Sequence, residues 1–373
     1  MTLNEIASLV FRLATLAQLA YWVLLFRKLA FYRQDRLSEE EKKEEQPPVS
    51  VVICAKNEEA NIQQYLTHFL NQKYRSFEVV VVNDGSTDNT WSRLLEFQKK
   101  YATLTLVNVP FATPPGKKTA LSLGIAHAAS DLLLLSDADC RPSSPFWIEK
   151  MQQSLPEEKQ IALGFSPYEK EQGFLNLFIR FEAVYTAVQY VSFALAGFPY
   201  MGVGRNLMYR KSVFTANNGF SGHLHLASGD DDLFVNAVSS KENTATVLEP
   251  ETFVYTKPKR TWAGYYYQKT RHFSTGAHYR RLHKLLLGGL ALSHSLHYLA
   301  LGILMCAPWE RQNAFIWFLA RMLVVAGLYF KILKRLKHRG LWPWIPLLDA
   351  LIPIYYLIFA PSIFFGKNRT WKQ

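Results

Sequence analysis

The chain has 373 residues, and 42 Lys and Arg against 30 Asp and Glu give a formal net charge of +12. Hydrophobic residues make up 49% of the chain, which excludes a disordered protein, and a mean hydropathy near zero excludes a protein made only of membrane helices. Three widely spaced cysteines predict neither a disulfide framework nor a zinc site.

Four long apolar segments flank a more polar middle region. They are 6–26, 285–309, 313–330 and 341–366. Each is close to the roughly 20 residues that a helix needs to cross a bilayer. No small-residue cleavage pattern precedes the basic cluster after the first segment, so we expect residues 1–31 to be a retained membrane anchor and not a signal peptide.

The positive charge lies beside these apolar segments. Residues 27–36, 257–284, 331–339 and 367–372 together carry +19, which leaves the rest of the chain at −7. Because basic residues favour the cytoplasmic side of a membrane, we expect an integral protein of the cytoplasmic membrane whose middle region faces the cytoplasm. Basic residues that follow membrane boundaries do not indicate a nucleic-acid-binding module.

The last apolar segment allows two placements. One more crossing would put the basic tail, Lys367 to Lys372, outside, and four prolines interrupt the segment. We therefore favour a re-entrant or interfacial segment over a full span.

Two charged residues fall inside apolar segments and need partners there. Arg321 and Asp349 lie at similar depths, so we expect them to pair. We expect His294 and His297 to form hydrogen bonds within the bundle and not to bind metal.

After the anchor, the sequence predicts a charged linker over 32–48 and an α/β domain over 49–280. We expect residues 281–373 to form a membrane bundle. Short apolar runs at 49–54, 77–83, 104–109 and 132–136 are typical of buried parallel strands, and helical patterns at 57–70, 87–101 and 116–129 alternate with them. This alternation predicts a doubly wound sheet with its site at the carboxyl ends of the strands. We expect 174–197 to form an amphipathic helix at the membrane surface.

Polar residues follow three of the predicted strands. Asp137 and Asp139 follow the run LLLLS, and two carboxylates one residue apart can share a divalent cation, although an isolated Asp-x-Asp is more often a capping loop. Lys117 opens a predicted helix whose free N–H groups suit a diphosphate; a plain helix start explains it equally well.

Taken together, these motifs resemble glycosyltransferase family 2. The matching segments are VSVVICAKNEEANI, VVVVNDGSTDNT, PPGKKTALSLGI, LLLLSDADC, ASGDDDLF and QKTRH, in the family's order over about residues 49–275. The resemblance implies a GT-A fold, a doubly wound mixed sheet that binds a nucleotide-sugar. With its membrane segments, the chain looks like the membrane-integrated branch that includes cellulose synthase-like and ceramide glucosyltransferase-like enzymes.

The resemblance also implies roles for individual residues. Asp231 would be the general base, with Asp230 as the second choice, and Asp137 and Asp139 would hold Mg²⁺ or Mn²⁺. The donor, a UDP- or GDP-sugar, would contact Glu58, Asp84, Lys117, Asp137, Asp139, Gln268 and Arg271. The acceptor side would include Gly204, Arg205, Asn206 and His272.

His272 departs from the family pattern, because processive members have a Trp there that helps to hold the acceptor sugar. This departure puts polymer synthesis in doubt. We expect an inverting, metal-dependent transferase that acts on a lipid or membrane-associated acceptor, because the domain is held between a membrane anchor and a membrane bundle. A processive polysaccharide synthase is the alternative, and a non-catalytic nucleotide-sugar-binding scaffold is a third possibility. The sequence leaves the donor base, the sugar and the acceptor open.

Overall fold

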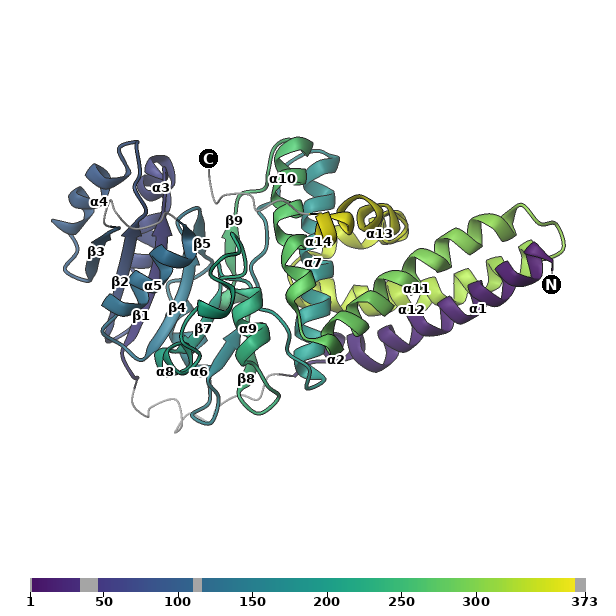
Figure 1. Cartoon of the computed structure of the whole chain (residues 1–373), viewed down its shortest axis with the longest axis horizontal. Coiled ribbons are helices and arrows are strands. Elements are labelled where there is room, and N and C mark those ends of the chain that lie inside the picture. The colour runs from purple at the N-terminus through teal and green to yellow at the C-terminus, as the bar shows by residue number, and fades with distance from the viewer. Residues whose placement is uncertain (1, 34–45, 110–115, 366–373) are drawn as a thin grey trace.

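The computed structural model describes residues 2–33, 46–109 and 116–365. Most of the predicted linker and the basic tail lie outside these residues. The α/β domain forms one end of an elongated molecule, and three long helices project from the other (Figure 1).

The domain contains the mixed sheet that the resemblance implies. Its strand order is β3-β2-β1-β4-β7-β6-β8. The strands are β1 (Val49–Ala55), β2 (Phe77–Asn83), β3 (Leu104–Asn108), β4 (Leu132–Asp137), β6 (Ile161–Leu163), β7 (Leu207–Arg210) and β8 (Thr244–Thr246). The first four are parallel, which confirms the predicted strands, and β7 is antiparallel to β4. A second, two-stranded sheet pairs β5 (Cys140–Pro142) with β9 (Val254–Thr256).

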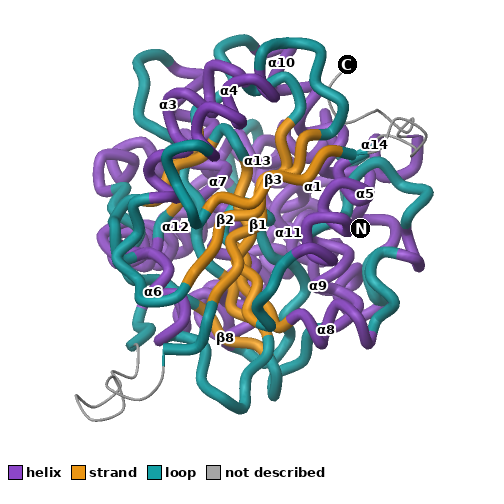
Figure 2. The backbone as a smooth tube through the Cα atoms, turned by 90° about the vertical axis from the view of Figure 1, so that its left-hand side faces the viewer, coloured by secondary structure: helices purple, strands orange, loops and turns teal. Residues whose placement is uncertain are grey.

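Helices cover both faces of the large sheet, whose strands run through the middle of the molecule (Figure 2). They include α3 (Glu59–Leu70), α4 (Thr90–Gln98), α5 (Lys117–His127), α6 (Trp147–Gln153), α8 (Lys211–Ala216) and α9 (Asp232–Val238). Helix α5 comes especially close, because a Cβ on Gly124 would lie 2.7 Å from Val52 and 2.8 Å from Val82. Alternate side chains of β1 belong to two hydrophobic clusters, as a strand buried on both faces requires.

Helix α7 (Phe174–Leu195) corrects the prediction of an amphipathic surface helix. Its buried residues lie on opposite faces of the helix: Phe178, Glu182 and Tyr185 on one face and Arg180 on the other. The prediction was wrong because α7 is enclosed between the sheet and the bundle, where Lys269 pairs with Glu182. One hydrophobic cluster runs from the sheet through α7 to Tyr329 in the bundle, so domain and bundle share a core.

Three long helical segments form the bundle (Figure 1). The first is α1 (Leu3–Ala20), which continues as a π-helical turn η1 (Tyr21–Phe26) and α2 (Arg27–Ala30); the others are α11 (Arg281–Met305) and α12 (Arg311–Arg335). Each is long and apolar enough to cross a membrane, and so is the fourth segment, Arg339–Phe364.

The fourth segment runs differently from the other three. It comprises η6 (Arg339–Trp344), α13 (Ile345–Phe359) and α14 (Pro361–Phe365). Figure 1 shows α13 nearly end-on while the three long helices extend along the page, so α13 crosses the direction of the bundle. Helix α14 then contacts α10 (Trp262–Phe273) and η5 (Ser274–His278) of the domain. The re-entrant arrangement that the prolines favour stays a prediction, because this segment is also long and apolar enough to cross a membrane.

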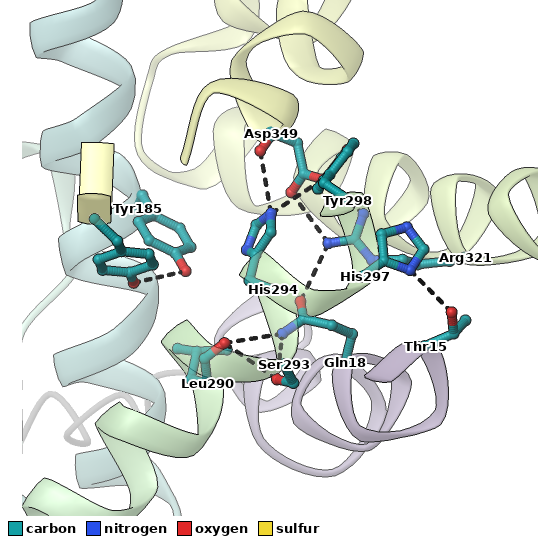
Figure 3. Close-up of polar contacts among 11 residues, drawn as sticks. Thr15, Gln18, Tyr185, Leu290, Ser293, His294, His297, Tyr298, Arg321 and Asp349 are labelled. Carbon is teal, nitrogen blue, oxygen red and sulfur yellow. Dashed lines mark hydrogen bonds and ion pairs between the residues drawn. The ribbon is translucent and has the colours of Figure 1, made fainter. Parts of the chain in front are cut away.

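The predicted pair inside the bundle is present (Figure 3). Arg321 Nη1 lies 2.6 Å from Asp349 Oδ2, and both side chains are buried. Gln18 accepts a hydrogen bond from Arg321 Nη2 at 3.1 Å. His294 and His297 form hydrogen bonds to the Asp349 carbonyl and to Thr15, which confirms the expectation that they bond within the bundle.

Candidate active site

Strand register brings the predicted site residues to one edge of the sheet. Cys54 lies opposite Asp137, and Ala55 lies opposite Asn83, so the chain segments that carry Glu58, Asp84 and Asp139 leave the sheet side by side. The antiparallel strand β7 begins at this same edge. The Ser136 hydroxyl donates to the Arg205 carbonyl at 3.0 Å, which fixes the turn before β7 beside the end of β4.

Lys117 connects two parts of the site. Its Nζ lies 3.0 Å from Asp137 Oδ1 and 2.8 Å from Asp230 Oδ2. Burial lowers the pKa of Lys117, but Asp137 and Asp230 outweigh it and hold that pKa well above its usual value. Lys117 therefore carries a full charge at the N-terminus of α5, a position suited to a diphosphate.

The three consecutive aspartates have different partners. Asp230 is paired with Lys117, and Asp232 accepts hydrogen bonds from Thr275 Oγ1 at 2.5 Å and from Tyr279 Oη at 2.7 Å. Within the described residues, the Asp231 carboxylate accepts hydrogen bonds only from main-chain N–H groups. Gly204 N–H donates to Oδ2 and Asp232 N–H donates to Oδ1, both at 2.8 Å. Asp230 and Asp232 are buried, whereas Asp231 is partly exposed.

The pKa values of Asp230 and Asp231 are shifted in opposite directions. Burial, together with the charges of Asp230 and Asp232, raises the pKa of Asp231 to about 7. Burial raises the pKa of Asp230, but the positive charge of Lys117 outweighs burial, so the pKa of Asp230 is lowered. A base must be able to gain a proton near neutral pH, so the geometry and the pKa both favour Asp231 over Asp230.

The residues after β4 fit a divalent cation. A carboxylate oxygen from Asp137, one from Asp139 and the Cys140 thiol lie within 4.8 Å of one another. Hard cations such as Mg²⁺ prefer oxygen ligands, and the Cys140 side chain is fully buried, so the two carboxylates are the better ligands. Their charges repel each other across a short distance, and a cation would relieve that repulsion.

Glu58 and Asp84 are both buried near the start of α3. The main-chain N–H of Glu58 donates to Thr90 Oγ1 at 2.8 Å, and its carboxylate accepts from Asn61 at 2.5 Å. Asp84 Oδ2 lies 3.7 Å from Lys56 Nζ. A pocket of about 330 Å³ opens here between residues 57–63 and Asp88.

Tyr168, which the sequence motifs did not identify, joins two predicted segments. The Arg205 guanidinium lies 4.8 Å from the centre of its ring, and Gln268 Nε2 donates to its hydroxyl at 3.3 Å. Gln268 belongs to α10, which also carries Arg271 and His272. The side chain of His272 is exposed at the end of α10.

Asn206 corrects one acceptor-side prediction. Its side chain is completely buried, and all its amide groups bond within the protein: Oδ1 accepts from Trp147 at 3.0 Å, and Nδ2 donates to the carbonyls of Phe165 and Thr252. Asn206 therefore fixes the fold behind the site and is not placed to contact an acceptor.

The segment before the aspartates is also fixed from within the protein. Lys118 Nζ donates to the carbonyls of His223 at 2.6 Å and Leu226 at 2.9 Å, and the His223 ring bonds to the Gly229 carbonyl. His223 therefore has a structural partner.

The sequence did not identify Thr275 and Tyr279 as the hydrogen-bond donors to Asp232. Their only signal in the sequence is a position shortly after the QKTRH segment.

Comparison with known proteins supports the family that the motifs predict. Residues 50–215 match the model of glycosyl transferase family 2. A probable glycosyltransferase of Bacillus subtilis, YdaM, is 27% identical over 60% of the chain and 54% of its own length. A dolichyl-phosphate beta-glucosyltransferase of Trichomonas vaginalis is 37% identical over 24% of the chain and 30% of its own length. The chain thus spans about a third to a half of these curated relatives.

The fold has a solved counterpart over nearly its whole length. The structure of a mannosyltransferase from Pyrobaculum calidifontis, in complex with GDP-Man and Mn²⁺, aligns with a TM-score of 0.59 at 19% identity. The alignment covers 95% of this chain and 99% of the other. By its matched segment, residues 50–215, and by its fold, the chain contains a glycosyltransferase family 2 domain with a GT-A fold.

Proposed function

We propose that the protein transfers a sugar from a nucleotide-sugar to a lipid or membrane-associated acceptor, with inversion at the anomeric carbon. The observation that carries the proposal is the Asp231 carboxylate, which is partly exposed, oriented by two main-chain N–H groups and has a pKa of about 7.

In the proposed reaction, Asp231 accepts the proton of an acceptor hydroxyl while the hydroxyl oxygen attacks the anomeric carbon. The bond from that carbon to the diphosphate oxygen breaks, and the nucleoside diphosphate leaves with the electron pair. Because the attack and the departure take place on opposite faces in one step, the anomeric configuration inverts. Lys117 and Arg271 would bind the diphosphate through charge-assisted hydrogen bonds.

Asp137 and Asp139 would hold Mg²⁺ or Mn²⁺, whose charge would offset the negative charge that grows on the leaving diphosphate. The Pyrobaculum neighbour was solved in complex with Mn²⁺, which supports a divalent cation as the cofactor. Glu58, which lines the pocket at residues 57–63, and Asp84 remain the residues proposed for the nucleoside.

Direct contacts between the site and the bundle favour a membrane acceptor. Asp232 bonds to Tyr279, two residues before α11 begins. Lys269 on α10 lies 2.5 Å from Glu182 on α7, and Glu182 accepts from Tyr355 on α13 at 3.1 Å. The site therefore lies at the base of the bundle, where the head group of a lipid would emerge. The dolichyl-phosphate relative supports this acceptor class.

Transfer of single sugars fits the bundle better than export of a polymer. Gln18, His297, Arg321 and Asp349 fill its interior, and each is completely buried. A polymer channel along this axis would have to displace the Arg321–Asp349 pair. By the positive-inside tendency, we propose that the domain faces the cytoplasm.

The experiment is to incubate membranes containing the protein with a panel of labelled UDP- and GDP-sugars and to extract lipid and polymer fractions. We expect label in the lipid fraction with one sugar per acceptor, and none with Asp231→Asn. Label in long chains would favour a synthase. Donor binding without turnover, in wild type and Asp231→Asn alike, would favour a scaffold.

A further inference from the structure

A basic recess lies between α7, the end of α12 and η6. Its volume is about 860 Å³, and its lining includes Lys170, Arg180, Lys334, Lys337, Arg339 and Trp344. Glu171 is the one acidic lining residue, and its carboxylate lies 3.9 Å from Arg260. Five cations therefore face one cavity: Arg180, Lys334 and Arg339 lie on α7, α12 and η6, and Lys170 and Lys337 lie in the loops beside them. No ion pair links any of the five to an acid within the described ranges.

Arg180 is the unusual member of this group. Its side chain is only 7% exposed, and its Nε is buried without a hydrogen-bond partner. Burial lowers the pKa of Arg180, because it disfavours the charged guanidinium. No carboxylate of the described chain pairs with this charge. Burying a charge without a partner is strongly unfavourable, so a buried guanidinium that lines a cavity indicates an anion that binds there.

Lys337 faces the recess from a backbone conformation that normally favours glycine. Helix α12 ends at Arg335, Lys337 has φ +60°, and the His338 N–H donates to the Leu333 carbonyl at 2.8 Å. This is the hydrogen bond of a Schellman motif, in which the left-handed residue is usually Gly. Lysine here costs backbone strain and adds a positive charge at the recess.

The recess lies where the bundle meets the domain. Lys334 belongs to the last turn of α12, and η6 begins at Arg339. Trp342 and Trp344 of η6 are 42% and 47% exposed. Tryptophans and basic residues at the end of an apolar helix are typical of the head-group layer of a bilayer.

The recess is separate from the catalytic site. Gly173, Asn176, Leu177 and Arg180 line it and follow the i, i+3, i+4, i+7 spacing of a single helix face. Glu182, two residues beyond Arg180 and so on nearly the opposite face of α7, contacts Lys269 of α10, the helix that carries Arg271 and His272.

We propose that the basic recess binds the phosphate head group of an anionic membrane lipid. The cations meet the phosphate, Trp344 lies in the head-group layer, and the acyl chains extend along the apolar helices. This lipid is distinct from the acceptor, and it joins the domain to the bundle at the α7–α12 contact.

The test uses the full chain in detergent, without donor, and native mass spectrometry to measure binding of dioctanoyl phosphatidylglycerol. We expect one lipid bound at least five-fold more tightly than dioctanoyl phosphatidylcholine. Removing one lining cation should weaken binding about five-fold, since a basic residue near an anionic lipid surface contributes about that factor. Lys334→Gln tests this, and Lys331→Gln is its control: Lys331 is exposed three residues earlier on α12 and does not line the recess.

Lys337→Gly separates binding from folding. It relieves the left-handed strain, so its melting temperature should equal or exceed that of wild type while lipid binding falls. Equal binding of the two lipids would overturn the proposal, as would equal losses in Lys331→Gln and Lys334→Gln. Displacement of the lipid by an equal concentration of inorganic phosphate would also overturn it, because the site would then recognise free phosphate. Sugar transfer is not part of the measurement, so failure here leaves the proposed reaction untouched.

Discussion

The main-chain N–H of Gly204 donates to Asp231 Oδ2 at 2.8 Å, and this bond joins the turn before β7 to the N-terminus of α9. The glycine brings the turn close to the carboxylate: a Cβ at position 204 would lie 3.2 Å from both Cβ and Oδ2 of Asp231. Gly204 therefore orients the proposed base and leaves it just enough room.

Gly204→Ala should push the Asp231 carboxylate aside by a few tenths of an ångström. A misplacement of 1 Å can cost about 100-fold in rate, so we expect kcat to fall about ten-fold. Donor affinity and melting temperature should stay near wild type. Gly222→Ala is the control, because a Cβ there would meet nothing within 4 Å. Equal rates in both variants would show that the contact does not position the base.

The rate should depend on pH through Asp231. Burial beside Asp230 and Asp232 raises the pKa of Asp231 to about 7, so below that pH a proton occupies the proposed base. We expect kcat/KM to rise about ten-fold per pH unit up to about 7 and then to level off. Lys117 lowers the pKa of Asp230, which stays ionised across this range. A flat profile between pH 5.5 and 8 would argue against Asp231 as the base.

Metal binding should depend on Asp139, which follows β4, and not on Asp131, which precedes it. Asp139→Asn removes one of the two proposed ligands, so Mn²⁺ binding in the presence of a nucleoside diphosphate should weaken at least ten-fold by electron paramagnetic resonance. Asp131→Asn is the control, because Asp131 lies at the other end of β4 and pairs with Arg210 at 3.5 Å. Equal Mn²⁺ affinity in the two variants would place the metal elsewhere.

The Arg321–Asp349 pair should appear as a coupling energy. Arg321→Leu and Asp349→Leu each leave one buried charge without its partner, so each should cost about 3–5 kcal/mol of stability in detergent. The double variant should cost less than the two single costs together, by about 0.5–3 kcal/mol. Additive losses would mean that the two side chains do not depend on each other.

The sequence predicted those parts of the fold that follow from local patterns. The strands β1, β2, β3 and β4 are continuous apolar runs, because parallel strands are buried on both faces. The strands β6, β8 and β9 have three residues each, too few for a recognisable pattern, and were not predicted.

Contacts between distant segments explain the remaining differences. Arg180 and Glu182 made α7 look like a surface helix, because nothing in the sequence shows that Lys269 pairs with Glu182. Asn206 belongs to a motif-like turn, yet its amide is bonded to Trp147 and to two carbonyls elsewhere in the chain. The segments that follow β1, β2 and β4 lie side by side because the strand register fixes where each strand ends.

The most direct test of the account is the single-turnover rate of Asp231→Asn beside that of Asp230→Asn, with donor affinity measured for both. We predict that Asp231→Asn loses about 10²- to 10⁴-fold in rate, as expected for removal of a general base, and binds the nucleotide-sugar as wild type does. Asp230→Asn should weaken donor binding as well, because it removes the partner of Lys117. Full turnover by Asp231→Asn with normal donor and metal binding would contradict the assignment of Asp231 as the catalytic base.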